Sequence, residues 1–395
     1  MDKILIAGGG YADIPLIEAA RSLGLYVITS GNRPDELGHR HSDEYHACDF
    51  SDREAITELA RRLKVDAICP CCNDFSALSA AWAAERLGLP GHDSPAKLET
   101  LMHKDKFHKF AREHGLPVAS AHLCQSLEDL KKLPSEMDWP VIVKPVDMTG
   151  GKGISVARSP AELERSARFA QKASRTPRFI VEEFLTPDSY HHNYVSFVGD
   201  GKVVWEASDN EHYWKNPYLV WGMSTPSVED DAIHAQLRDT INKITGLLEL
   251  KPGIFMAQHC VVDGKLKIVE MGRRSPGNLH GRMLELSTGF DVSLWTIRAA
   301  LGEDIPAQPP AGSSRCIAEH CVMAPANGRI KSIEIDPCIG AHILEKIWLM
   351  RPGDTVENHL LDKMGILLLE FDTMEEMLEA SGRMQEYVRV NVEKR

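Results

Sequence analysis

Residues 255–277 read FMAQHCVVDGKLKIVEMGRRSPG, and they decide the fold more than any other stretch of the chain. Two apolar runs flank the Asp-Gly dipeptide at 263–264, which is the commonest signal for a short β-hairpin turn. The first predicted strand carries Gln258, and the second ends in Glu270 and continues into Arg273-Arg274. This pattern suits a divalent cation that holds polyphosphate, because Mg²⁺ prefers oxygen ligands and shares them with phosphates. Taken alone, the stretch is equally typical of an ordinary hairpin with a charged end.

Composition limits the classes of protein that this chain can represent. Its 395 residues are too many for one simple core, so two or three domains are expected. A net charge of -12 disfavours nucleic acid and anionic membrane surfaces as the main partners. Nine scattered cysteines lack the paired spacing of a zinc site, and we find neither a secretory signal nor an apolar run of about 18 residues. We therefore expect reduced thiols and a cytoplasmic location.

The first hundred residues alternate between predicted strands and helices. This βαβ rhythm predicts a parallel sheet with helices on both faces. At the first strand-to-helix turn, three glycines at 8–10 could cradle an anion, as in nicotinamide-dinucleotide sites, but Asp13 stands where the third glycine of that motif belongs. A tight turn is the other interpretation. The predicted strands are 3–7, 25–30 and 65–69, and the predicted helices are 13–23, 52–63 and 75–87.

A second unit begins near residue 116 and carries a lysine and a glycine-rich loop. Lys144 ends the apolar strand PVIVKP, and Gly150, Gly151, Lys152 and Gly153 follow. Such glycines let the backbone approach a phosphate closely and let a hairpin close over it as a lid. A flexible hairpin between two strands is the alternative.

The apolar strand at 179–185 ends in the acidic pair Glu182 and Glu183. Alternation along a strand points their side chains to opposite faces, so at least one is expected at a cleft. The strand backbone could hold the edge of an adenine, as it holds a partner strand. Glutamates that simply reach water at a strand end are the other interpretation.

In their order along the chain, these features resemble the ATP-grasp superfamily, over roughly residues 1–310. The order is Asp105-Lys106 before a helix, Lys144, the GGKG loop, the VEEFL strand, and then the hairpin with its arginines. The resemblance implies ATP as cofactor. By similarity, the phosphates would meet Lys106, Lys144, Gly150, Gly151, Lys152 and Gly153, the adenine would meet Glu182, Glu183, Phe184 and Leu185, and the ribose would meet His191.

The same resemblance implies a metal site and a catalytic arginine. Gln258 and Glu270 would bind Mg²⁺ or Mn²⁺, with Gln at the first place as in the carbamoyl phosphate synthetase branch. Arg274, with Arg273 beside it, would stabilise the acyl phosphate and the transferring phosphoryl group. The chain departs from the usual E-x-N-x-R pattern at Gly272, which offers no side-chain oxygen. The number of metal ions is therefore left open.

The implied fold class is α/β, an ATP-grasp fold with an N-terminal parallel-sheet domain, a lid subdomain and a C-terminal α+β unit. We expect domains at 1–115, 116–310 with the lid at about 118–185, and 311–395, with a Pro-rich linker at 306–312. Single helices are expected at 282–301 and 373–388. The loop after Arg274 and the C-terminal unit resemble those of ATP-grasp amino-acid and dipeptide ligases.

The expected activity is an ATP-dependent ligase that joins a small carboxylate to an amine, with amino-acid ligation favoured over purine-precursor chemistry. A homodimer is expected by analogy. An aromatic stretch at 212–221 could line a specificity pocket or pack an interface. A non-catalytic Mg-ATP-binding protein and a nicotinamide-dependent oxidoreductase are the rival hypotheses.

Overall fold

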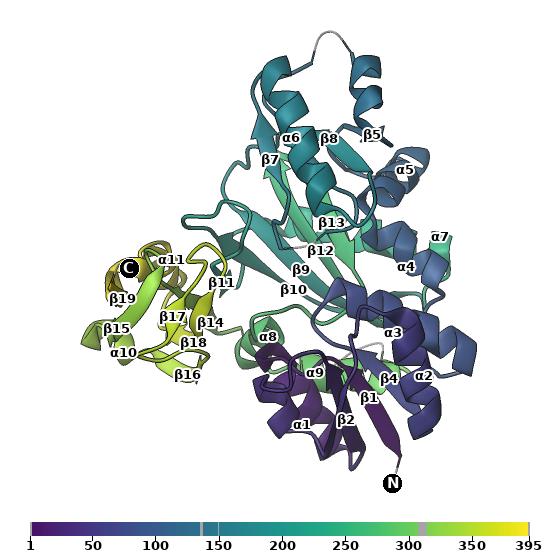
Figure 1. Cartoon of the computed structure of the whole chain (residues 1–395), viewed down its shortest axis with the longest axis vertical. Coiled ribbons are helices and arrows are strands. Elements are labelled where there is room, and N and C mark those ends of the chain that lie inside the picture. Colours follow the sequence, from purple (N-terminus) through teal and green to yellow (C-terminus); the bar gives the residue numbers. More distant parts are fainter. Residues whose placement is uncertain (1, 135–136, 149, 307–313, 394–395) are drawn as a thin grey trace.

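The computed structural model describes residues 2–134, 137–148, 150–306 and 314–393. Figure 1 shows the N-terminal unit in purple, the yellow C-terminal unit beside it, and a small sheet above the long strands at the centre. None of the described helices is long and apolar enough to cross a membrane. The predicted linker at 307–312 lies outside the described residues, and so does the expected boundary at 310.

The N-terminal unit is a parallel sheet in the order β3-β2-β1-β4, as the βαβ pattern predicted. Its helices begin at caps that the sequence supplies: Asp52 accepts hydrogen bonds from the first amides of α2, and Asn73 does so for α3. The elements are β1 (Lys3–Ala7), η1 (Tyr11–Asp13), α1 (Ile14–Ser22), β2 (Tyr26–Gly31), η2 (Leu37–Arg40), β3 (Glu44–Ala47), α2 (Arg53–Leu63), β4 (Ala67–Pro70) and α3 (Asp74–Leu87).

Two helices lead into the lid, a four-stranded antiparallel sheet in the order β5-β8-β6-β7. Its apolar face packs on α6, whose N-cap Ser159 accepts a hydrogen bond from the amide of Glu162. The elements are α4 (Pro95–Met102), α5 (Lys104–His114), β5 (Ala121–Cys124), η3 (Leu127–Lys132), β6 (Val141–Pro145), β7 (Ser155–Ala157), α6 (Pro160–Ala173) and β8 (Phe179–Glu183).

The central sheet has eight strands in the order β13-β12-β9-β10-β11-β14-β18-β16. Helix α7 packs on one face, and α8 and α9 cover part of the other. The helix predicted at 282–301 is wrong, because Gly289 ends α8 in a left-handed conformation and Asp291 caps α9. The elements are β9 (His191–Gly199), β10 (Lys202–His212), β11 (Gly222–Thr225), α7 (Asp231–Leu248), β12 (Gly253–Val262), β13 (Lys265–Gly272), α8 (His280–Thr288) and α9 (Val292–Ala300).

The C-terminal unit shares the central sheet, because three of its strands continue that sheet beyond β11. The remaining strands form a small sheet in the order β17-β15-β19. The helix predicted at 373–388 is interrupted at Arg383, which lies outside helical geometry between α11 and α12. The elements are β14 (Cys316–Met323), β15 (Gly328–Ile335), α10 (Pro337–Gly340), β16 (Ile343–Trp348), β17 (Thr355–Val356), β18 (Lys363–Phe371), α11 (Met374–Gly382), α12 (Met384–Tyr387) and β19 (Val388–Glu393).

Candidate active site

A row of polar side chains crosses four strands of the central sheet on one face. The register pairs Glu270 on β13 with Gln258 on β12, as the hairpin predicted. It then pairs Gln258 with Asn193 on β9, and Asn193 with Asp209 on β10. Because neighbouring strands lie about 4.8 Å apart, directly opposed residues present their side chains to the same cleft.

Glu270 lies at one end of this row and is neutralised by a lysine from the start of α5. Lys104 Nζ lies 3.2 Å from Glu270 Oε2 and donates a hydrogen bond to the carbonyl of Met148, next to the glycine loop. Burial alone would raise the pKa of Glu270, but Lys104, Lys144 and Arg274 hold that pKa below its usual value. A carboxylate that stays ionised is the form that binds a metal.

The prediction for Lys106 is corrected by this geometry. Its ammonium pairs at 2.5 Å with Glu99 on α4, not with the groups around Glu270. Residues two apart on a helix point about 200° apart, so only one of the two lysines can face the cleft. The structure assigns that place to Lys104.

Lys144, at the end of β6, forms a buried ion pair with Glu182 on the neighbouring strand β8. Lys144 Nζ lies 2.5 Å from Glu182 Oε2, and His108 Nε2 lies 2.9 Å from the other carboxylate oxygen. Burial would raise the pKa of Glu182, but Lys144 and His108 lower it to about 2. The Glu182 side chain is therefore committed within the protein, and any contact with adenine at this residue would come from its backbone.

The glycine loop reaches across the cleft to the aromatic stretch. Gly150, Gly151 and Gly153 all have positive φ, at 65°, 71° and 76°. A Cβ added at Gly151 would lie 2.4 Å from the carbonyl oxygen of Tyr218, so only glycine allows this approach. Lys152 is exposed and forms no ion pair with any residue in the described ranges.

The strand end that follows β8 presents backbone and an apolar ring to the same region. Glu183 accepts a hydrogen bond from the Ser120 amide at 3.2 Å and lies 3.6 Å from Lys267 Nζ. Phe184 is exposed and Leu185 is half-buried. The Glu183 amide also donates to the Ser120 carbonyl at 3.0 Å, so the predicted main-chain contact with adenine at 183–185 would need another backbone group and stays a prediction.

His191 lies inside the cleft at the start of β9. Its ring meets Tyr213 edge-to-face with 5.8 Å between ring centroids, and its Nδ1 is buried without a partner among the described residues. Burial, with Lys144 nearby, lowers the pKa of His191 to about 4, so the imidazole is neutral at physiological pH. A neutral ring with a free nitrogen can bond to a hydroxyl group, which suits the predicted ribose contact.

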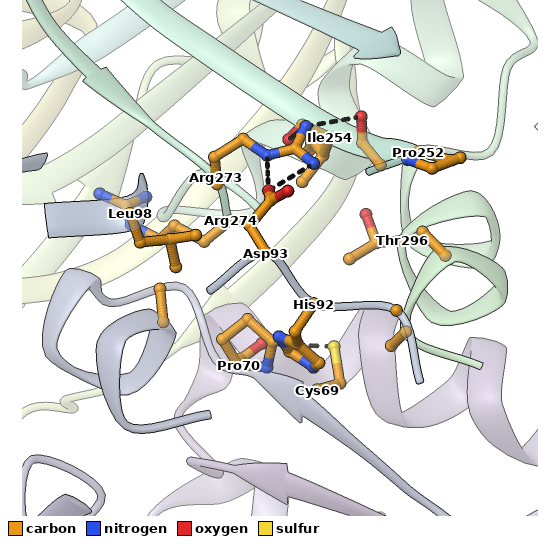
Figure 2. Close-up of a pocket in the computed structure, with 15 residues that line it drawn as sticks. Cys69, Pro70, His92, Asp93, Leu98, Pro252, Ile254, Arg273, Arg274 and Thr296 are labelled. Atoms are coloured by element: carbon orange, nitrogen blue, oxygen red, sulfur yellow. Dashed lines mark hydrogen bonds and ion pairs between the residues drawn. The ribbon is translucent and has the colours of Figure 1, made fainter. Parts of the chain in front are cut away.

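The two arginines after β13 have different surroundings. Arg274 Nε lies 2.5 Å from Asp74 of α3, and its charge acts on Glu270. Figure 2 shows Arg273 paired with Asp93 in a pocket between the units that Arg274 also lines. Arg273 donates further hydrogen bonds to the carbonyls of Lys251, Gly253 and Ile254. The predicted catalytic role of Arg273 is corrected to a structural one, because its donors are used within the fold.

Gly272 ends β13 beside Met256, where the family pattern has asparagine. A Cβ at Gly272 would lie 3.1 Å from Met256 Cγ, so the methionine side chain occupies the neighbourhood of the missing amide. Among the described residues, no three His, Cys, Asp or Glu side chains are arranged to hold a metal ion by themselves. Gln258 and Glu270 therefore fit a cation only if phosphate oxygens and water complete its shell, as is usual for Mg²⁺.

Sequence reasoning missed several residues that complete this cleft. Glu211 Oε2 accepts hydrogen bonds from Gln258 Nε2 at 2.7 Å and from the Tyr213 hydroxyl. Period-two alternation in the segment DNEH places Asp209 and Glu211 on one face, which is the signal that could have found them. The other missed residues are Lys104, Asn193 and Glu319.

The aromatic stretch divides between the cleft and the core of the C-terminal unit. Tyr213 faces the cleft beside Glu211 and His191, whereas Trp221 is buried in the core of the C-terminal unit. Trp214 packs against Trp221 with 5.7 Å between ring centroids.

The glycine turn after β1 is closed by its own carboxylate. Asp13 is buried and accepts hydrogen bonds from the amides of Gly10 at 2.8 Å and Cys72 at 2.9 Å. The Gly10 amide belongs to the glycine turn and is a donor that the pyrophosphate of a dinucleotide would need. The geometry therefore favours the tight turn over a nicotinamide site.

Known proteins resemble this chain in sequence over the central part of its length. The family model described as "Carbamoyl-phosphate synthase L chain, ATP binding domain" matches residues 103–308. Formate-dependent phosphoribosylglycinamide formyltransferases are similar: that of a Nitratiruptor species is 29% identical over 188 residues, 47% of this chain and 48% of that protein. That of a Synechococcus species is 31% identical over 189 residues, with the same shares covered. The chain thus spans about half the length of the curated relatives it matches.

Solved structures match along the whole chain at low sequence identity. The L-amino acid ligase from Bacillus licheniformis has a TM-score of 0.80 at 18% identity, covering 100% of this chain and 99% of that one. Phosphoribosylglycinamide synthetase from Anaerococcus prevotii has a TM-score of 0.78 at 19% identity, covering 99% and 100%. At such identities the likeness establishes the fold and leaves the substrates open.

Proposed function

Because the chain belongs to the family of the carbamoyl-phosphate synthase L chain ATP-binding domain, an ATP-grasp family, we propose that it is an ATP-dependent ligase acting on a carboxylate and an amine. The ATP-grasp fold expected from the sequence is confirmed by the family match and by the solved structures. The activity proposed is activation of a small carboxylate as an acyl phosphate, followed by attack of the amine and release of ADP and phosphate.

The observation that carries this proposal is the meeting of Lys104 with Glu270 beside the glycine loop. Lys104 Nζ lies within hydrogen-bond distance of two groups far from it in the sequence, the Met148 carbonyl and the Glu270 carboxylate. Positively charged side chains lie around an ionised carboxylate next to the glycine loop. This arrangement suits a nucleoside triphosphate and its metal ion.

Each residue has a role in the proposed reaction. Lys104, Lys144 and the lid amides would neutralise the phosphates, and the backbone at 182–185 would hold the adenine. Gln258 and Glu270 would hold Mg²⁺ or Mn²⁺, which supplies Lewis-acid stabilisation of the phosphoryl oxygens when bound. Arg274 stabilises the negative charge that develops as the phosphoryl group moves to the carboxylate.

Amino-acid ligation is the acceptor chemistry that we favour, and purine-precursor chemistry is the second candidate. The relatives described above support purine-precursor chemistry, since their names give phosphoribosylglycinamide as the substrate. The buried Asp13 supports amino-acid ligation, because it already accepts hydrogen bonds from the Gly10 and Cys72 amides, which could otherwise bind a substrate phosphate. A non-catalytic ATP-binding role rests on Gly272 alone.

The proposal is tested by ADP release from Mg-ATP across a panel of small carboxylates and amines, with product mass read in parallel. A pair that triggers ADP and a condensed product supports the ligase and names its substrates. Glu270→Gln should lower turnover at least 100-fold, whereas Glu99→Gln, at the ion pair outside the cleft, should retain it. ATP binding by thermal shift without ADP release from any pair would contradict the ligase and favour the non-catalytic role. We also propose that the protein is a homodimer, and light scattering on the same sample measures its mass in solution.

A further inference from the structure

A cluster of buried acidic residues extends the polar row away from the metal ligands, and the reaction steps above do not use it. Asp209 and Glu211 lie on β10, and Glu319 lies on β14. The register aligns Glu211 with Met223 and Met223 with Glu319, so the two glutamates lie on the same face of the sheet. All three carboxylates are at most 4% exposed.

Two oxygens of this cluster are buried without any partner. Asp209 Oδ1 and Glu319 Oε2 accept no hydrogen bond from the described part of the chain. Among the described residues, the hydrogen-bond donor to Glu319 is the Cys321 thiol, with Sγ 3.7 Å from Oε1, and no described cation lies within ion-pair distance of its carboxylate. Native proteins rarely leave such groups unpaired, so each indicates a missing donor.

The cluster contains fewer positive than negative groups. His280, at the start of α8, lies 2.6 Å from Asp209 Oδ2, and Asp209 and Glu319 raise the pKa of His280 against the effect of burial. Lys363 donates at 2.5 Å to the Asn278 side chain, which also accepts a hydrogen bond from Tyr11 at 3.0 Å. His280 and the Lys363 side chain near Glu319 therefore accompany three buried acidic side chains, and this excess of acidic groups would be complemented by a cationic ligand.

The position of the cluster connects it to the reaction. Gln258 Nε2 donates to Glu211, so the acidic cluster begins next to the candidate metal site. Tyr11 from the N-terminal unit, the loop after β13 and two strands of the C-terminal unit enclose it. This is a place where a second substrate can face a carboxylate activated at the metal.

We propose that Asp209 and Glu319 form the subsite that binds the primary ammonium group of the amine substrate. An ammonium carries three N–H donors and can supply the hydrogen bonds that the two orphaned oxygens lack. The absence of a metal-holding arrangement among the described acidic and imidazole groups favours an organic cation over a metal. The inference rests on the proposed function, because it assigns the amine of that reaction.

Direct binding tests this subsite separately from catalysis. Glycinamide, L-alaninamide and ethanolamine are titrated by calorimetry into the full chain saturated with Mg-ADP, with neutral N-acetylglycinamide for comparison. At least one primary ammonium should bind, and its affinity should fall at least tenfold in Glu319→Gln with ADP affinity unchanged. Asp209→Asn is the second variant. The matched control is Glu206→Gln, on the same strand but paired with Arg238 on the opposite face.

The outcomes separate the two proposals. Amine binding that depends on Glu319 supports the subsite even if no carboxylate ever triggers ADP release, in which case only the ligase proposal fails. Failure of all three amines to bind overturns the subsite. It is also overturned if N-acetylglycinamide binds as tightly as the amines, or if Glu319→Gln and Asp209→Asn both bind the amine as tightly as the natural protein does. Electron paramagnetic resonance measures Mn²⁺ binding to the same proteins. Mn²⁺ binding that is lost in Glu319→Gln would overturn the ammonium subsite in favour of a metal site.

Discussion

The Lys144 and Glu182 side chains depend on each other, and this determines how Lys144 can be tested. Because both are buried, removing one charge leaves the other uncompensated, which typically costs about 3–5 kcal/mol. We expect Lys144→Met to lower the free energy of unfolding in urea by at least about 2 kcal/mol, since His108 compensates part of the charge. Adding Glu182→Gln should recover most of that loss.

Nucleotide affinity, measured on the same variants, reports the other role of Lys144. Both the single and the double variant should bind ATP more weakly, because both lack the ammonium. If the double variant recovers stability and ATP affinity together, Lys144 does not contact phosphate.

Gly272 is a second residue whose role a single substitution can test. Its backbone does not require glycine, and the only close neighbour of an added Cβ is the flexible Met256 side chain. Gly272→Asn should therefore fold and add an oxygen donor beside Glu270. We expect Mn²⁺, followed by electron paramagnetic resonance with ADP present, to bind severalfold more tightly. Gly272→Ala is the control, and equal affinities in the two variants would show that position 272 does not reach the metal.

At this scale the sequence predicted residue types better than side-chain directions. Gln258, Glu270 and Arg274 lie where the motif order placed them, because a hairpin is a local structure with fixed alternation. Lys106 was chosen over its close neighbour Lys104, and Arg273 was included beside Arg274. The start of α5 decides which of the two lysines faces the cleft, and the end of β13 decides this for the two arginines. Neither boundary can be located precisely from the sequence.

At the scale of elements, the lid loop offers a matched pair of glycines. Gly150 and Gly151 have similar positive φ, so alanine at either position introduces similar backbone strain, on the order of 1–2 kcal/mol. Only Gly151 lies against Tyr218, whereas a Cβ at Gly150 would meet nothing within 4 Å. Gly151→Ala should therefore raise the Kd for ATP severalfold more than Gly150→Ala, measured by calorimetry. Equal effects of the two variants would mean that the contact with Tyr218 does not support lid closure.

Elements were predictable where their contacts are local. The βαβ units, the hairpin and the lid strands follow from periodicity and turn residues, and the structure confirms them. Nothing in the sequence indicated that β14 would pair with β11, because 91 residues separate Thr225 from Cys316 and strand pairing at such distances leaves no periodic signal. The acidic cluster was missed for the same reason, since Glu319 shares a sheet face with Glu211 only through that pairing.

At the scale of the whole molecule, the N-terminal unit is joined to the central sheet by charge and by apolar packing. Arg273 and Arg274 bind Asp93 and Asp74, and Ile297 and Ala300 of α9 lie in the same apolar cluster as β1 and α1. The proposed subsite for the amine lies where the N-terminal unit, the central sheet and the C-terminal unit meet. Ionisation of the acidic side chains in this subsite should therefore affect the free energy of unfolding of the whole chain.

The pH dependence of unfolding should report this coupling. Burial raises the pKa of Glu319 to about 8, opposed by His280 and Lys363 and reinforced by Asp209, with the Cys321 thiol as its hydrogen-bond partner. Between the ordinary carboxyl range near 4.5 and this value, the folded chain holds a proton that the unfolded chain has released. The stability from Glu319 is thus fully present below about pH 4.5 and is lost as pH rises through about 8.

Glu319→Gln removes this titration without changing the shape of the side chain. We expect the variant to gain thermal stability relative to the natural protein as pH rises from about 5 to about 8.5, with a constant difference above that range. Differential scanning calorimetry without ligands measures it, and Glu206→Gln, whose carboxylate is paired with Arg238, should show no such trend. A glycinamide-saturated sample should reduce the difference, because a bound ammonium stabilises the ionised carboxylate and supplies the donor that Glu319 lacks. A difference that does not change with pH would show that Glu319 is already paired in solution and would remove the physical basis for a cationic ligand at this junction.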